Sequence, residues 1–264
     1  MINLFKAQKE FNDYLKSFDL SDEMIKLKIR HTYGVMALSE YISKDLNLSQ
    51  EDIELAQLIA LLHDIARFIQ VSTFGDFRDY KTLDHADLAV EILFGEQLIR
   101  RFIEDDKYDS IMLKAIKNHN KLSIEEGLTE KELLHSRIIR DADKADNFRV
   151  NVNEDFAAIC NSSKEQIEDD YVSEKVYNTF MNGELIITRD RATVLDNLIG
   201  TLAFIFDFNF PAGLKYIKEN DYVNAMIDRF SYKKQYTVDQ MEEIRKRAVN
   251  YINKQIGDTQ FVLN

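Results

Sequence analysis

Apolar residues recur along much of the chain at the three- and four-residue spacing of helices. The pattern predicts a first helix up to Phe18 and a second helix for which Ser21 is the expected N-cap. On the second helix, His31 falls on the same face as three apolar residues, Leu27, Val35 and Leu38. We therefore expect His31 to point inward.

The segment 53–70 (IELAQLIALLHDIARFIQ) is apolar nearly all round, as expected for a central, buried helix. Ser49 and Asp52 form a capping-box pattern before it. His63 and Asp64 are neighbours in this helix, about 100° apart around its axis, so they can share a metal ion that lies in the angle between them. Burial of an unpaired carboxylate is unfavourable unless a cation compensates its charge, and the doublet therefore favours a metal site.

The segment 71–83 (VSTFGDFRDYKTL) lacks helical periodicity and contains Gly75, which predicts a loop over the pocket. A helix that carries His85 on its apolar stripe is expected to start near Asp84. Asp84 can be read there simply as an N-cap, with His85 as a first-turn residue.

Two more helices are predicted before residue 150. In the first, residues 109–121, His119 shares a face with Met112, Ala115 and Ile116. The second begins at a capping box formed by Thr129 and Glu132 and places three residues on one side: Ile139, Asp143 and Asp146. His135, in the same helix, belongs to no motif and is assigned to the surface or to helix packing.

Helical patterns continue after residue 150, without a low-complexity linker or an internal repeat, in the segments 176–185, 191–208 and 239–256. We interpret residues 151–264 as helices that complete one domain spanning residues 1–264. Asp207 lies among apolar residues; it is a candidate to close the pocket, but capping near Pro211 is its expected role.

The composition supports an all-α fold, because the 264 residues include one proline and eight glycines. A net charge of −12 argues against binding of extended nucleic acid, although a small phosphorylated ligand can still bind where local cations gather. The lone Cys160 fits a reducing compartment, and no apolar run approaches the length of a membrane span. We expect a cytoplasmic protein that does not bind membranes; the sequence does not indicate its oligomeric state.

The candidate ligands are four imidazoles and two carboxylates, with no thiolate: His31, His63, Asp64, His85, His119 and Asp143. These are too many ligands for one tetrahedral zinc ion and suit ions that keep water ligands, such as Mn, Fe, Co, Ni or Mg. An economical arrangement has two divalent metal ions with one carboxylate between them. Asp64 is the expected bridge because it follows a ligand and lies in the middle of the series.

The ordered pattern of His31, His63-Asp64 and Asp143 resembles the HD-domain superfamily of metal-dependent phosphohydrolases, which has an all-helical fold. The segments 61–68 (LLHDIARF) and 137–146 (RIIRDADKAD) look like the central and closing motifs of that superfamily. His85 in LDHADLAV and His119 in IKNHNK match the two additional ligands of its binuclear branch. The resemblance covers residues 22–150, and we expect this segment to form an HD-type helical bundle.

The resemblance implies that one metal ion is held by His31, His63, Asp64 and Asp143, and a second by Asp64, His85 and His119. It also implies that a metal-activated water hydrolyses a small phosphate ester or a nucleotide, with Asp64 at the catalytic centre. Arg67 lies one helical turn beyond His63 and is the expected phosphate clamp. Lys144, next to Asp143, is a second candidate for phosphate binding.

Several alternatives stay open. If His85 or His119 is not a ligand, the site holds one metal ion. The residues alone do not show which of Asp141, Asp143 and Asp146 binds metal; the position in the family motif favours Asp143, and Asp146 is a candidate outer acceptor for a ligand histidine. The same ligand set would also serve a binuclear-iron oxygenase that acts on a small polar substrate, or a non-catalytic nucleotide-binding module with a structural metal.

Overall fold

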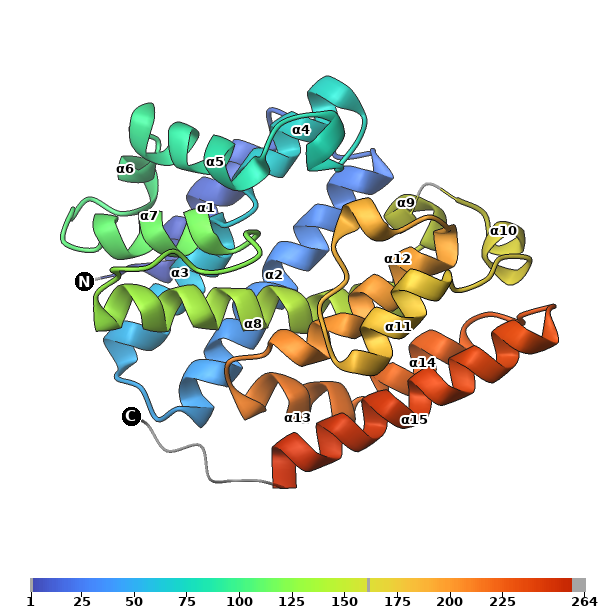
Figure 1. Cartoon of the computed structure of the whole chain (residues 1–264). Coiled ribbons are helices and arrows are strands. Elements are labelled where there is room, and N and C mark those ends of the chain that lie inside the picture. Colours follow the sequence, from blue (N-terminus) through green and yellow to red (C-terminus); the bar gives the residue numbers. More distant parts are fainter. Residues whose placement is uncertain (1, 161, 258–264) are drawn as a thin grey trace. The chain divides into compact units, whose positions relative to one another are not determined.

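The computed structural model describes residues 2–160 and 162–257, and every regular element in these ranges is helical (Figure 1). The predicted all-α fold is therefore confirmed. The chain divides into two compact units, residues 1–143 and residues 144–264, with the boundary inside one long helix. The interpretation of the chain as one domain stays a prediction.

Unit 1 contains α1 (Leu4–Leu15), α2 (Glu23–Asp45), α3 (Gln50–Leu62), α4 (Ile65–Phe74), η1 (Asp79–Lys81), α5 (His85–Val90), η2 (Glu91–Gly95), α6 (Ile99–Phe102), α7 (Asp109–Asn118) and the first part of α8 (Glu130–Asn153). Helix α2 packs along α3, α5 packs against α7, and α1 contacts α3 and α6. As predicted, α3 is buried nearly all round, through Leu55, Leu58, Ile59, Leu61 and Leu62.

The predicted capping box of Thr129 and Glu132 is present, Ser49 caps α3 with its side chain as predicted, and the cap of α2 differs from the prediction. The Ser49 side chain accepts from the Asp52 amide, and Thr129 and Glu132 bond reciprocally. The N-cap of α2 is Asp22, not Ser21, because the Asp22 backbone is extended and its carboxylate accepts from two amides of the first turn. Helix α1 also ends earlier than predicted, at Leu15.

The predicted central helix is broken in two. His63 ends α3 and Asp64 precedes α4, with Asp64 at φ −105° and ψ 19°, outside helical geometry. The loop predicted for residues 71–83 is wrong at its start, because α4 continues to Phe74 and ends at Gly75 in the left-handed conformation. Gly75 is thus a helix terminator.

One helical stretch among the described residues, Gln50–Phe74, is long and apolar enough to cross a membrane, and its most apolar 18-residue window has a mean hydropathy of 1.2. This corrects the expectation that no apolar run approaches such a length. Of its most apolar window, 83% is buried inside the protein. The stretch consists of α3 and α4. Helices that are buried in a protein core can have the same length and composition as a membrane span, and this stretch is mostly buried.

Unit 2 contains the rest of α8, followed by α9 (Phe156–Cys160), α10 (Lys164–Glu168), α11 (Glu174–Asn182), η3 (Thr188–Asp190), α12 (Val194–Leu202), η4 (Ala203–Asp207), α13 (Pro211–Glu219), α14 (Tyr222–Asp228) and α15 (Gln235–Gly257). The three predicted C-terminal helices correspond to α11, to α12 with η4, and to α15. Helix α15 packs against α11, α13 and α14. The core of this unit is apolar and includes Phe148, Phe180, Leu195, Ile217, Met226 and Ile244.

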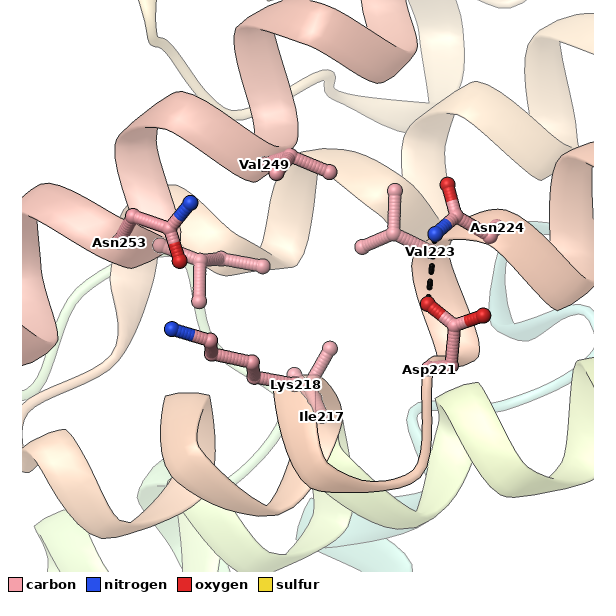
Figure 2. Close-up of a pocket in the computed structure, with 8 residues that line it drawn as sticks. Ile217, Lys218, Asp221, Val223, Asn224, Val249 and Asn253 are labelled. Atoms are coloured by element: carbon pink, nitrogen blue, oxygen red, sulfur yellow. Dashed lines mark hydrogen bonds between the residues drawn. The ribbon is translucent and has the colours of Figure 1, made fainter.

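A cavity of about 250 Å³ lies in unit 2 between α13, α14 and α15 (Figure 2). Its lining combines apolar side chains such as Val249 with polar ones such as Lys218 and Asp221. The expected capping role of Asp207 is wrong, because the N-cap of α13 is Phe210. Asp207 instead forms an ion pair with Lys144, at 2.7 Å.

Candidate metal centre

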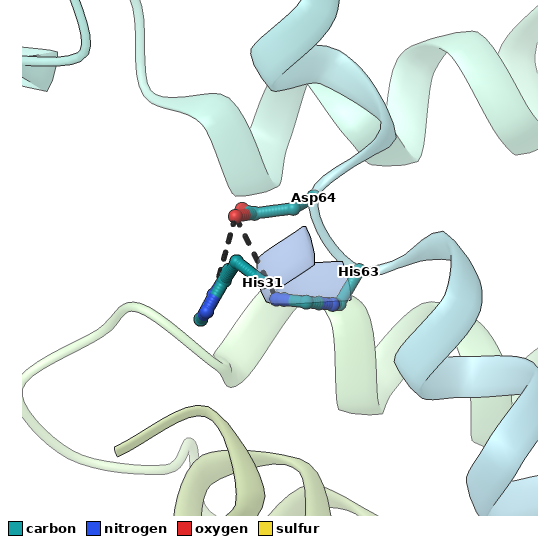
Figure 3. A group of neighbouring side chains, drawn as sticks. All are labelled: His31, His63 and Asp64. Atoms are coloured by element: carbon teal, nitrogen blue, oxygen red, sulfur yellow. Dashed lines mark ion pairs between the residues drawn. The ribbon is translucent and has the colours of Figure 1, made fainter. Parts of the chain in front are cut away.

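The six predicted ligands converge in unit 1, where two triads have ligand atoms within 4.8 Å of one another: His31, His63 and Asp64, and Asp64, His85 and His119 (Figure 3 shows the first). The side chain of Asp143 reaches the first triad, since its Oδ1 lies 3.1 Å from His31 Nε2. All of these side chains are buried except that of Asp143, which is partly exposed.

The Asp64 carboxylate lies between two pairs of imidazoles, with one oxygen toward each pair. Its Oδ2 is 3.7 Å from Nε2 of both His31 and His63. Its Oδ1 is 3.4 Å from His85 Nε2 and 3.7 Å from His119 Nε2. A carboxylate in this position can ligate one ion through each oxygen.

The break between α3 and α4 accounts for the orientation of Asp64. The residue occupies the N-cap position of α4, where an aspartate normally accepts from the amides of the first turn, but its side chain makes no capping hydrogen bond. Its backbone lies in the sparsely populated bridge region. The carboxylate is therefore turned away from its own helix and toward the histidines.

His63 and His119 are presented in the same way, each at the C-cap of a helix, α3 and α7. Their Nδ1 atoms lie 2.7 Å and 2.6 Å from the carbonyl oxygens of Ala60 and Ile116. A carbonyl only accepts, so each Nδ1 carries the proton and donates. In the neutral imidazole, Nε2 then has a free lone pair, as a metal ligand requires.

His85 begins α5, and Asp84 caps this helix by accepting from two amides of the first turn. The Nδ1 of His85 lies 2.7 Å from the Asp79 carboxylate, so it donates there and Nε2 is again unprotonated in the neutral ring. This Nε2 lies 2.9 Å from His119 Nε2. Two lone pairs at this distance repel each other unless a cation or a proton lies beside them.

His63 gives a second indication that the donor set fits a metal ion. Its Nε2 is buried and has no hydrogen-bond partner in the described part of the chain, a costly arrangement for a polar atom. Imidazole nitrogens together with carboxylate oxygens are typical ligands of divalent transition-metal ions such as iron, nickel and manganese. The clustered residues are therefore compatible with divalent metal binding.

The electrostatics keep the site in its ligand form at neutral pH. Burial lowers the pKa of His63 to about 4 and, together with the nearby Arg67, lowers the pKa of His85 to about 3. Burial alone would raise the pKa of Asp64, but the nearby cations, Lys28 first, outweigh burial and hold this pKa well below its usual range. His31 likewise outweighs burial and lowers the pKa of Asp143. At neutral pH the imidazoles of His63 and His85 are therefore neutral and the carboxylates of Asp64 and Asp143 are ionised, the forms in which these side chains ligate metal ions.

Sequence reasoning missed Asp79 and Lys28. Besides His85, the Asp79 carboxylate accepts from Arg67, Gln70 and Asn120, so it connects three segments of the site. Asp79 lies in a segment without periodicity, and no sequence signal marked it. Lys28 lies 2.8 Å from Asp64 Oδ2, and its position three residues before His31 was an available signal.

Arg67 is placed beside the site, but much of its guanidinium is already bonded. Its Nη1 donates to the side chains of Gln70 and Asp79 and to the carbonyl of Phe77, at 2.7, 2.9 and 2.5 Å. Its Nε lies 3.5 Å from Asp64 Oδ1. Among the hydrogen bonds of the described residues, none involves Nη2.

The remaining candidates have other partners. Within unit 2, Lys144 pairs with Asp207, and the Asp146 carboxylate accepts from Arg149 at 2.6 Å. His135 is buried against Asp52 in unit 1, at 3.4 Å, in agreement with its assignment to helix packing.

The described part of the chain is all-helical and holds a buried His/Asp cluster, so the protein belongs to the class of helical proteins with a candidate site for divalent metal ions. Residues 29–147 match the family model of the HD domain, and the His/Asp cluster is compatible with a metal site of that family. The match lies within the range, residues 22–150, in which the sequence motifs resemble that family. No curated protein and no solved structure matches the chain.

Proposed function

We propose that this protein is a metal-dependent phosphohydrolase that cleaves a small phosphate ester or a nucleotide. The observation that carries the proposal is the position of Asp64, with one carboxylate oxygen toward each of two imidazole pairs. The HD domain supports it, since this domain suggests metal-dependent chemistry of the hydrolase type.

Two sets of side chains would hold the metal ions: His31, His63, Asp64 and Asp143, and Asp64, His85 and His119. Divalent ions in such a site lower the pKa of a water molecule and neutralise charge on phosphoryl oxygens. The chain's own contribution is the orientation of the ligands, because the Nδ1 protons of His63, His85 and His119 are fixed by acceptors outside the cluster.

Arg67 is the proposed phosphate contact. Its Nη1 is held by three acceptors, which fixes the plane of the guanidinium, and Nη2 is left to donate to a phosphoryl oxygen. Lys144 is the weaker candidate, because it would first have to leave its ion pair with Asp207.

The test is hydrolysis of a panel of phosphomonoesters, nucleotides and cyclic dinucleotides by protein loaded with Mn, Mg, Fe(II), Co or Ni. Asp64→Ala is the inactive variant, and Asp87→Ala, an exposed aspartate on α5, is its matched control. We expect metal-dependent turnover that is lost in Asp64→Ala and kept in Asp87→Ala.

Other outcomes identify the alternatives. If no compound is hydrolysed and the iron-loaded protein consumes oxygen with a polyol or a phosphonate, the proposal is wrong and the oxygenase is favoured. Tight nucleotide binding without turnover would favour the regulatory module.

A further inference from the structure

Lys28 is the side chain that most directly neutralises Asp64. Its Nζ donates to Asp64 Oδ2 at 2.8 Å and lies 5.1 Å from the centre of the Phe77 ring. The Asp64 side chain is 3% exposed, whereas that of Lys28 is 15% exposed. The Lys28 side chain therefore contacts the buried carboxylate and is itself partly accessible to solvent.

The same oxygen is needed for metal binding. Asp64 Oδ2 is the atom that faces His31 and His63, each at 3.7 Å. A divalent cation held by these three side chains would carry positive charge next to the Lys28 ammonium, and the two would repel each other. Lys28 has a flexible four-carbon stem and three equivalent donors, so it can give up Oδ2 and turn toward another anion.

Arg67 does not have this freedom. Its guanidinium is tied to Asp79, Gln70 and the Phe77 carbonyl, and it approaches Asp64 through the other oxygen, Oδ1. Of the two cations beside Asp64, Lys28 is thus the one that a metal ion would displace.

We propose that Lys28 is an exchangeable countercharge and a substrate-binding residue. It neutralises Asp64 in the metal-free protein and contacts a phosphoryl oxygen of the substrate once a cation is bound at Oδ2. This inference rests on the proposed function for the identity of the substrate, and it assigns the phosphate contact on the Oδ2 side of the site.

The first test uses linkage between Lys28 and the metal ion, without an activity measurement. In Lys28→Met, the metal-free protein should unfold at a lower temperature than wild type, because Asp64 loses its countercharge. Mn²⁺ should bind about tenfold or more tightly, since the competing ammonium is gone. The difference in unfolding temperature should then shrink when Mn²⁺ is saturating.

The second test measures the affinity of the Mn²⁺-loaded protein for inorganic phosphate by calorimetry. We expect Lys28→Met to weaken binding about tenfold or more and Lys28→Arg to keep most of it. Lys26→Met is the matched control, because Lys26 is an exposed lysine of α2 that pairs with Glu23. If metal-free Lys28→Met does not fold, protein purified with Mn²⁺ still permits this measurement.

The inference is overturned if Lys28→Met destabilises the metal-free and Mn²⁺-loaded proteins equally and leaves phosphate affinity unchanged. That result, with hydrolysis by the wild type, would leave the proposed function intact. Conversely, the wild type could bind phosphate more tightly than Lys28→Met and yet hydrolyse none of the compounds. That result would support the inference and contradict the proposed function.

Discussion

The two sets of side chains on either side of Asp64 are held in different ways, apart from His63 and His119, which each follow the end of a helix and donate to a carbonyl oxygen. The first, here the His31 group, consists of His31, His63 and Asp143. Two of its members lie inside the long helices α2 and α8, of 23 and 24 residues. The second, here the His85 group, consists of His85, His119 and Asp79. It depends on α5, a helix of six residues, and on the short η1.

The difference lies in what fixes the ligand positions. Core packing of long amphipathic helices places the His31 group, since the neighbours of His31 on α2, such as Val35 and Leu38, are buried. Polar contacts place the His85 group, because Asp79 holds the His85 ring and Asp84, paired with Lys121, caps α5. We therefore expect the His85 group to be the more sensitive to polar substitutions that leave the core intact.

The largest expected effects come from removing one ligand of each group. His63→Gln and His119→Gln should each reduce hydrolysis by more than about 100-fold, because even outer partners of ligands contribute about 10–100-fold. Each variant should also bind one metal ion fewer per chain, as measured by elemental analysis.

His135→Gln is the matched control, because His135 is also buried but bonds to Asp52 outside the cluster. It should keep the wild-type metal content. Full metal content in His119→Gln would show that the His85 group does not bind metal.

The next effect is on the stability of the metal-free protein at acid pH. The pKa of His63 is lowered from 6.5 to about 4 by burial, so between these values the unfolded chain binds the proton that the folded chain excludes. The contribution of the neutral His63 ring to the free energy of unfolding is therefore fully present above pH 6.5 and is lost as the pH falls toward 4. The loss is on the order of 3 kcal/mol from His63 alone.

Urea unfolding in the presence of a chelator measures this loss. His63→Gln and His85→Gln should each flatten the profile, since burial also lowers the pKa of His85, to about 3. A wild-type profile that is flat between pH 4 and 6.5 would contradict the expected burial of neutral imidazoles.

Asp79→Asn tests the polar support of the His85 group directly. The amide cannot replace both oxygens that now accept from Arg67 and His85, so the His85 ring loses its fixed orientation. We expect metal affinity at the His85 group to fall about 10–100-fold, with the His31 group unchanged.

Asp76→Asn is the control for this change, because Asp76 lies in the same segment and pairs with Arg78. A calorimetric titration that resolves two binding events distinguishes the groups. Equal weakening of both events would show that Asp79 supports the whole site rather than one group.

The same contrast explains which parts of the structure could be predicted from sequence. Helical periodicity placed His31 correctly on an inward face, because one face of a long helix must be buried. Periodicity could not show the break at Asp64, since an apolar run looks the same whether its helix is continuous or interrupted. Asp79 was unpredictable for a related reason: its partners Arg67, Gln70 and Asn120 meet through tertiary structure, and local spacing carries no signal for that.

The smallest expected effect compares the N-caps of two ligand-bearing helices. Asp84→Ala and Thr129→Ala should each lower stability by about 1 kcal/mol, the usual contribution of a capping side chain. Their effects on metal binding should differ. Helix α5 has six residues and carries His85 in its first turn, so loss of Asp84 should weaken the His85 group severalfold. Asp143 lies more than three turns into α8, where fraying of the first turn does not reach it. Metal titration of the two variants at equal loss of stability would separate these effects, and equal metal affinities would refute the distinction between the two groups.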